Sequence, residues 1–107
     1  MPRPAKFTII YAPETVDHLN AVERKYHRLI RATVKEQLSY TPDQITRNRK
    51  PLDPPMPFGA TLELRFGPQN RFRIFYEIDA EALAVWVLAV GVKEGNRLFI
   101  GREEFTP

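Results

Sequence analysis

The chain has 107 residues, of which 43% are hydrophobic, and 16 Lys and Arg stand against 13 Asp and Glu to give a net charge of +3. This length suits one hydrophobic core, so we expect a single domain over residues 1–107. The modest positive charge favours an anionic partner such as nucleic acid or an acidic protein segment. The chain contains no cysteine, which excludes a disulfide framework, a thiolate metal site and a cysteine nucleophile.

No apolar stretch approaches the roughly 18 residues of a membrane span, and the N-terminal segment lacks the apolar run of a signal peptide. We therefore expect a soluble, cytoplasmic protein with no membrane partner. No zinc-ligand spacing, Gly-rich phosphate loop or Ser-His-Asp arrangement occurs in the sequence, so we expect neither a metal nor another cofactor.

The N-terminal third predicts a strand followed by helix. Phe7 to Tyr11 is a β-branched and aromatic run that ends before Pro13. From Glu14 to Tyr40 apolar residues recur at spacings of three and four, which is typical of an amphipathic helix. No Gly or Pro interrupts this segment, so the pattern leaves open whether it is one helix or a helical hairpin. The apolar stripe consists of Leu19, Val22, Tyr26, Leu29, Ile30, Val34 and Leu38.

A proline-rich segment from Asp43 to Gly59 separates the helical part from three predicted strands. Its prolines force extended backbone and remove hydrogen-bond donors, so we expect a surface loop. The strands are Leu62 to Phe66, Phe72 to Ile78, and the nearly all-apolar Val85 to Val92, which we expect to be central in the sheet. Gly67 to Asn70 are turn formers that join the first two strands.

The order of these elements predicts an α+β fold, with an N-terminal strand and helices packed on one face of a mostly antiparallel, roughly four-stranded sheet. Alternation along the first two strands puts Phe66 opposite Phe72 and Arg65 near Arg73. Arg65, Arg73 and Glu63 would then share the face away from the helices. An ion-pair ladder with no specific task is the alternative explanation for these three charges.

Other polar and aromatic side chains have simpler interpretations. His18 and His27 lie on the predicted helix at a spacing that fits no common metal pair, so we expect both on its surface. Trp86 lies in the central strand and should belong to the core. Tyr76 should also be core, whereas its neighbour Phe75 points to the other face, where it would cover the sheet or stack on a nucleobase.

Four strings resemble the RelE/ParE superfamily of bacterial toxins from type II toxin-antitoxin systems. They are NRKPL at 48–52, LELRFG at 62–67, RFRIFYEID at 71–79 and VLAVGVKEGNRLF at 87–99. The likeness extends over nearly the whole chain, including the order of elements. It implies a RelE-like fold, a cognate antitoxin as partner, and a metal-independent endoribonuclease that cuts mRNA at the ribosome.

The resemblance also assigns roles to residues. Arg73 would contact the scissile phosphate, Lys93 falls where the ribonuclease branch commonly has an arginine, and Arg65 would add a second guanidinium. Glu63 would be the general base that accepts the proton of the attacking 2′-hydroxyl, although the nearby arginines stabilise its ionised form and weaken it as a base. The residues expected to bind RNA are Arg47, Arg49, Lys50, Arg71 and Arg97; the first three could equally form a solvated loop.

Two departures from the family pattern leave an alternative open. Basic residues often occupy the strand that here holds Thr61, Glu63 and Arg65, and only Arg65 is positive. The family's tyrosine aligns with Phe99, which has no hydroxyl to exchange a proton. A relative that inhibits gyrase, or that only binds its antitoxin, is therefore the second hypothesis.

Overall fold

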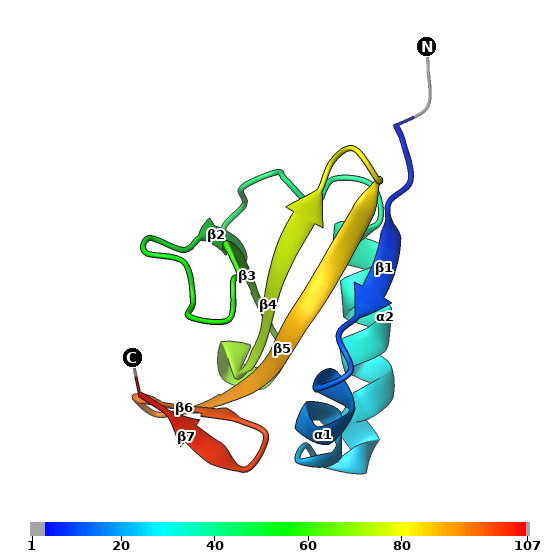
Figure 1. Ribbon diagram of the computed structural model, residues 1–107. Coiled ribbons are helices and arrows are strands. Elements are labelled where there is room, and N and C mark those ends of the chain that lie inside the picture. The colour runs from blue at the N-terminus through cyan, green and yellow to red at the C-terminus, as the bar shows by residue number, and fades with distance from the viewer. Residues whose placement is uncertain (1–3, 107) are drawn as a thin grey trace.

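The protein has two layers, a seven-stranded sheet and two helices that cover one face of it (Figure 1). This computed structural model describes residues 4–106. The first residues of the N-terminal segment, for which the sequence predicts no signal peptide, lie outside the described residues. No helix within 4–106 is long and apolar enough to cross a membrane.

The N-terminal part contains strand β1 (Thr8–Tyr11), helix α1 (Thr15–Asn20), a 3-10 turn (Arg24–Tyr26) and helix α2 (His27–Leu38). The structure thus resolves the open question in favour of two helices. The backbone is extended at Glu23, with φ −51° and ψ 133°, which ends the first helical segment.

Buried residues from both helices form the main core together with one face of the sheet. Ile30, Val34 and Leu38 have no exposed surface, because their spacing of four puts them on one side of α2. Leu29, which the sequence pattern places in the stripe, is 42% exposed. Leu29 directly precedes Ile30, so its side chain is rotated from that of Ile30 by about 100° around the helix axis.

The sheet is mostly antiparallel, in the order β2-β3-β4-β5-β6-β7, with β1 parallel to β5. The expected three strands correspond to β3 (Leu62–Phe66), β4 (Phe72–Asp79) and β5 (Ala84–Glu94). The expectation of roughly four strands is wrong, since the sheet has seven. The strands that the sequence did not reveal are β2 (Arg49–Pro51), β6 (Arg97–Ile100) and β7 (Glu103–Phe105).

These strands were missed because they are only three or four residues long, and β2 and β7 also lack an apolar pattern. Strand β2 lies inside the predicted loop and includes Pro51. A proline is tolerated there because β2 is at the edge of the sheet and needs no second partner strand.

The predicted register of the β3–β4 hairpin is confirmed. Phe66 pairs with Phe72 and Arg65 with Arg73. The turn between them begins at Gly67, whose φ is 83°; a β-carbon at this position would overlap the Phe72 ring. Glycine is therefore required for both the backbone conformation and the close approach.

A bulge in β5 changes which of its side chains face the helices. Phe75 pairs with Ala89 and the next residue, Tyr76, pairs with Val87, so Leu88 has no partner in β4. Beyond this extra residue the alternation is inverted. Trp86 pairs with Glu77 on the helix-free face and is 38% exposed, so its assignment to the core is wrong.

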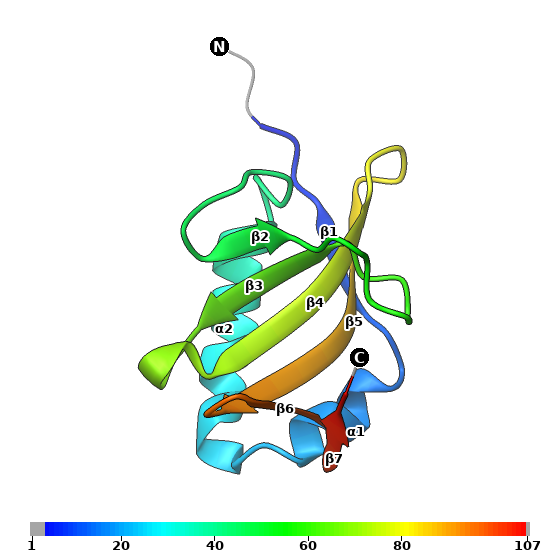
Figure 2. The same ribbon diagram turned by 90° about the vertical axis from the view of Figure 1, so that its left-hand side faces the viewer.

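Half of the helix-free face is covered by a second, smaller core. Phe75 is fully buried there, as expected for a residue that covers the sheet. The ring of Phe58, from the proline-rich loop, lies edge-on to it with centroids 6.0 Å apart. Buried or partly buried residues of this core are Leu52, Met56, Ala60, Phe75, Leu88, Ala89, Leu98 and Ile100. In Figure 2 the helix-free face is toward the viewer and the helices lie behind the sheet.

Candidate functional site

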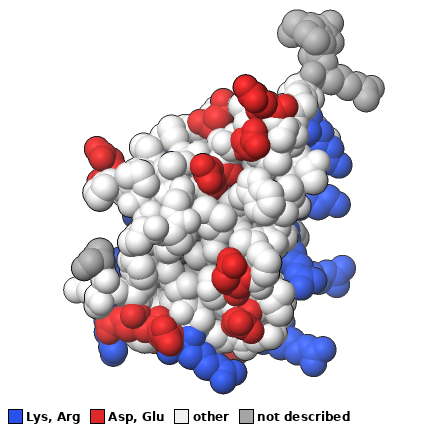
Figure 3. Space-filling model, viewed as in Figure 1, with Lys and Arg blue, Asp and Glu red and all other residues white. Residues whose placement is uncertain are grey.

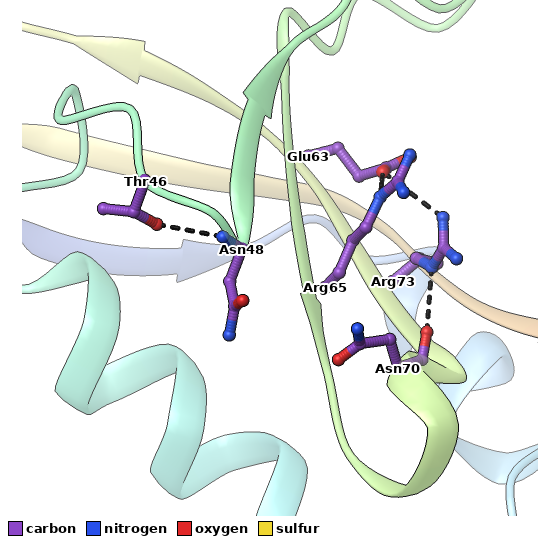
Figure 4. Close-up of polar contacts among 6 residues, drawn as sticks. All are labelled: Thr46, Asn48, Glu63, Arg65, Asn70 and Arg73. Atoms are coloured by element: carbon purple, nitrogen blue, oxygen red, sulfur yellow. Dashed lines mark hydrogen bonds and ion pairs between the residues drawn. The ribbon is translucent and has the colours of Figure 1, made fainter.

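The site is built on the uncovered half of the helix-free face, where β3 and β4 bring two arginines and a glutamate together (Figure 4). Glu63 Oε1 accepts a hydrogen bond from Arg65 Nε, and it also accepts one from Arg73 Nη1 at 3.3 Å. Alternation along β3 puts Glu63 and Arg65 on the same face, and the register puts Arg73 directly across from Arg65. One carboxylate oxygen thus binds both guanidinium groups.

Arg73 is fixed at both ends of its guanidinium group. Its Nε donates to the backbone carbonyl of Asn70 at 3.1 Å, and its Nη1 donates to Glu63. Burial lowers the pKa of Arg73 from its ordinary value, and the charge of Glu63 opposes this change. An arginine remains charged at neutral pH even so. Its cation therefore stays in a defined position and orientation.

The three side chains differ in their access to solvent. The side chains of Glu63 and Arg73 are 8% and 10% exposed, whereas that of Arg65 is 33% exposed. A ligand that approaches this face therefore meets Arg65 first. The ligand reaches Arg73 only if it displaces Glu63 from this arginine or binds the remaining N–H donors of the Arg73 guanidinium group.

Two lysines extend the positive charge on either side. Lys50 of β2 pairs with Glu63, and Gly91 of β5 pairs with Arg73. Two residues beyond Gly91, Lys93 lies on the same face by alternation. The arginine pair, Lys50 and Lys93 give this face of the sheet four positive charges and one carboxylate. We call Lys50, Glu63, Arg65, Arg73 and Lys93 the arginine face.

This arrangement suits phosphodiester chemistry. Two fixed guanidinium groups can bind phosphate oxygens in a fork, which lysine cannot do. Preorganised donors stabilise the charge that develops on phosphate oxygens in a transition state. The ion pairs expected from the alternative interpretation of these charges are also present, so the geometry is compatible with both. Within residues 4–106 no group of His, Asp and Glu side chains could hold a metal ion.

Two of the predicted residues lie on the other side of the sheet. Phe99 pairs with Val92, whose side chain belongs to the helix-side core. Arg71 lies near the same place, with its guanidinium carbon 5.9 Å from the centroid of Tyr26. Both line a cleft of about 230 Å³ between the α1–α2 connection and β6. The Phe99 position is therefore separated from Arg73 by the sheet itself.

Arg97 and Arg49 also lie apart from the arginine face. Arg97 is exposed, pairs with Glu104 at 3.0 Å and lies over the ring of Phe99. Arg49 is 6% exposed, and its guanidinium donates to the carbonyl of Thr41, to that of Gln44 and to Gln37 Oε1. The predicted position of Arg49 in a surface loop is wrong, because it lies in β2 with its side chain directed to the end of α2. Arg47, by contrast, is exposed.

Sequence reasoning missed several contributions to the site. The place of Lys50 beside Glu63 depends on β2, which the sequence pattern did not predict. The backbone carbonyl of Asn70 could not be foreseen either, since it depends on left-handed backbone at Gln69 and Asn70. The turn-forming residues Gly67 to Asn70 were the only signal of such a turn.

The sequence predicted that His18 and His27 lie on the helix surface, but the side chain of each also contacts another part of the fold. His18 Nδ1 accepts a hydrogen bond from the backbone N–H of Val90 at 3.2 Å. His27 Nε2 is 2.8 Å from the carbonyl of Val22, which connects the start of α2 to the segment that follows α1. Each histidine thus links two elements of the fold.

Fold and site together define a small α+β protein with a helix-free, cationic sheet face. No protein-family model and no curated protein match the chain. Among solved structures, it is similar to the crystal structure of the toxin-antitoxin complex RelBE2 from Mycobacterium tuberculosis, with a TM-score of 0.68 and 22% sequence identity. The match covers 87% of this chain and 98% of the other. The likeness confirms the predicted RelE-like fold.

Proposed function

We propose that this protein is the toxin of a type II toxin-antitoxin system and that it is a metal-independent endoribonuclease acting on mRNA at the ribosome. The observation that carries the proposal is the pair of opposed arginines, Arg65 and Arg73, on the helix-free face of a RelE-like sheet. Such a protein acts in the cytoplasm and needs no cofactor.

In the proposed reaction the 2′-hydroxyl of the RNA attacks the adjacent phosphorus. The new P–O bond gives a 2′,3′-cyclic phosphate, and the bond to the 5′-oxygen of the next nucleotide breaks. Arg73 and Arg65 bind the non-bridging oxygens, where negative charge develops. When the phosphate takes over the two guanidinium groups, Glu63 is released to accept the proton of the 2′-hydroxyl. The leaving oxygen takes up a proton from Lys93 or from water.

The alternative function is supported by two observations. Glu63 already forms ion pairs with both arginines in the free protein, and Phe99 offers no hydroxyl and lies across the sheet from Arg73. A protein of this fold without ribonuclease activity would inhibit gyrase or only bind its antitoxin.

Induction of the protein in cells that lack an antitoxin tests both functions. The proposed ribonuclease predicts arrest of translation and new mRNA 5′ ends that carry hydroxyl groups. Accumulated DNA breaks with intact mRNA would select gyrase instead. Unchanged growth with intact mRNA and DNA would leave antitoxin binding as the function.

We propose the free edge of β1 as the place where an acidic antitoxin segment docks. The N–H groups of Thr8 and Ala12 donate to the carbonyls of Leu83 and Val87. Because backbone groups alternate in direction along a strand, the N–H and C=O of Ile9 point away from β5, toward the free edge. An extended segment could add there as another strand. A groove of about 480 Å³ beside this edge combines apolar and positive side chains, namely Lys6, Phe7, Thr8, Ile9, Tyr11, Arg31, Lys35 and Ser39.

Charge reversal in this groove tests the docking site. Lys6→Glu should weaken antitoxin binding because it puts a negative charge beside an acidic segment, and it should leave the arginine face unaltered. Antitoxin affinity equal to that of the original protein would show that the segment docks elsewhere.

A further inference from the structure

A groove of about 540 Å³ lies between the start of α1, the bulged part of β5 and strand β7. We call it the β7 groove. In Figure 1, β7 and α1 lie on either side of the lower part of β5. The floor of the groove is apolar and includes side chains that remain partly or fully exposed, namely Phe58, Leu88, Ile100 and Phe105.

The bulge in β5 enlarges this apolar surface. Leu88, the extra residue of the bulge, has no partner in β4 and lines the groove. Trp86, two positions earlier on the same strand, is 38% exposed, and Phe58 in the groove is 37% exposed. Exposed aromatic side chains beside an apolar groove are typical of a surface that binds another polypeptide.

The rim of the groove is acidic. Glu14, Glu103 and Glu104 line it, and among residues 4–106 no Lys or Arg does. Glu104 pairs with Arg97, whereas none of the ion pairs within the described chain involves Glu14 or Glu103. In Figure 3, Asp and Glu are spread over the face that Figure 1 views, and Lys and Arg lie mainly along its border. The groove is therefore negative although the net charge of the protein is +3.

The groove also follows a free edge of the sheet. In the part of the chain that the structure describes, β7 pairs only with β6, so its other edge offers backbone N–H and C=O groups for a further strand. All three residues of β7 line the groove although their side chains alternate in direction, which places the groove along this edge. An extended segment can bind such an edge as an added strand.

The charge of the rim decides which kind of segment fits. The three glutamates that line the groove would repel nucleic acid and an acidic antitoxin segment. A second copy that docked through the same groove in a symmetric dimer would bring the glutamates of both copies together, which is unfavourable. A basic segment with apolar side chains at alternate positions matches the rim, the floor and the strand edge at once.

We infer that the β7 groove binds an extended, basic segment of a partner protein, which adds to β7 as a strand and places its apolar side chains on the groove floor. The inference goes beyond the proposed function and does not depend on RNA cleavage. Phe58, Leu88 and Ile100 lie over or against the second core, whereas the arginine face occupies the other half of the helix-free face. A bound segment therefore leaves the arginines accessible.

Binding of a short labelled peptide in which Lys alternates with Val, followed by fluorescence anisotropy with the full chain, tests the inference. A peptide of equal length in which Glu alternates with Val is the control and should not bind. The variant Glu14→Lys/Glu103→Lys should bind the Lys–Val peptide at least about tenfold more weakly at about 50 mM salt, because attraction becomes repulsion and salt screens little at this concentration.

Glu36→Lys/Glu81→Lys is the matched control variant, since both positions are exposed and lie outside the groove. It changes the net charge by the same amount and should lose much less affinity. Both variants should melt near the temperature of the original protein, because exposed substitutions have small effects on stability.

Protection of the edge strand from unwanted pairing is the alternative explanation for Glu103 and Glu104. Lysine protects an edge equally well, so this explanation predicts that Glu14→Lys/Glu103→Lys binds the Lys–Val peptide as the original protein does. Equal affinity of these two proteins, equal losses in the two double variants, or equal binding of the two peptides would overturn the inference. So would self-association of the original protein that Glu14→Lys/Glu103→Lys abolishes, because the occupant would then be a second copy.

Discussion

Arg65 and Arg73 lie directly opposite each other in the β3–β4 hairpin, and both donate hydrogen bonds to the same oxygen of Glu63. Without this carboxylate the two cations would repel each other on a face with limited access to water. The glutamate therefore stabilises the free protein and holds the arginines in the arrangement that a phosphate would meet.

Replacing Glu63 by Gln should destabilise the protein and strengthen its binding of RNA. The change leaves two opposed, partly buried guanidinium groups without a counter-charge, and we expect a loss of about 2 to 4 kcal/mol in the free energy of unfolding. Urea denaturation and single-strand RNA binding would measure the two effects. Glu81→Gln, at an exposed position in the β4–β5 turn, is the matched control and should change neither. A Glu63→Gln protein of undiminished stability would contradict the role assigned to the carboxylate.

Tyr76→Phe should lower stability by about 1 to 2 kcal/mol. The Tyr76 hydroxyl is buried and donates to the carbonyl of Pro42 at 2.8 Å, which ties the segment after α2 to the sheet. Burial raises the pKa of Tyr76 to about 12, so this phenol should ionise last when tyrosine absorbance is followed against pH. Tyr40→Phe, at a residue that is 50% exposed, should leave stability unchanged. Equal stability of the two variants would argue against the bond.

His18 should make the protein less stable as the pH falls. Burial lowers the pKa of His18 below its ordinary value of 6.5, although Glu14 and Asp17 oppose this effect. The unfolded chain then binds the proton more readily than the folded one, so the stabilisation is complete above about pH 7 and is lost as the pH falls through 6.5. Thermal melting between pH 8 and about pH 5 would measure this loss.

The variant His18→Asn isolates the contribution of this histidine. An asparagine oxygen can accept the hydrogen bond of the Val90 N–H and does not titrate. Its melting temperature should therefore vary less over the same range. Identical pH profiles for the two proteins would mean that His18 is not the group responsible.

Arg49 and Arg47 should differ although both were predicted to bind RNA. Arg49→Ala removes the donors to Thr41, Gln44 and Gln37 and should cost about 2 to 4 kcal/mol of stability, because the hydrogen bonds and packing of a buried guanidinium group are lost. Arg47→Ala, at an exposed position, should leave stability within about 0.5 kcal/mol. We expect a loss of RNA affinity without a loss of stability only for Arg47→Ala. An Arg49→Ala protein that loses RNA affinity but keeps its stability would contradict the structural role of Arg49.

Much of the fold could be predicted because strong local patterns agreed with the tertiary structure. The hairpin register followed from alternation alone, since Phe66 and Phe72 must face the same core. Ile30, Val34 and Leu38 were correctly placed because a spacing of four defines one side of a helix. These patterns arise from burial, which the sequence records directly.

The parts that could not be predicted depend on contacts distant in sequence. The bulge at Leu88 inverts the alternation of side chains along β5. A strand without this bulge would place Trp86 on the helix-side face, and the sequence pattern therefore assigned Trp86 to the core. Strand β2 has no apolar pattern, yet it places Lys50 opposite Glu63. The charges of the arginine face could be listed from the sequence, but their common contact with one carboxylate oxygen could not, because it requires the conformations of three long side chains.

The central claim is that Arg73 stabilises the reacting phosphate. The most direct test maps the 5′-hydroxyl ends of cellular mRNA after induction of the original protein, of Arg73→Ala, and of Arg102→Ala as a control at an exposed position. Loss of one preorganised donor should reduce cleavage by about 10²- to 10³-fold, so Arg73→Ala should give few new ends while Arg102→Ala gives the original number. New ends in equal number from folded Arg73→Ala protein would contradict the claim.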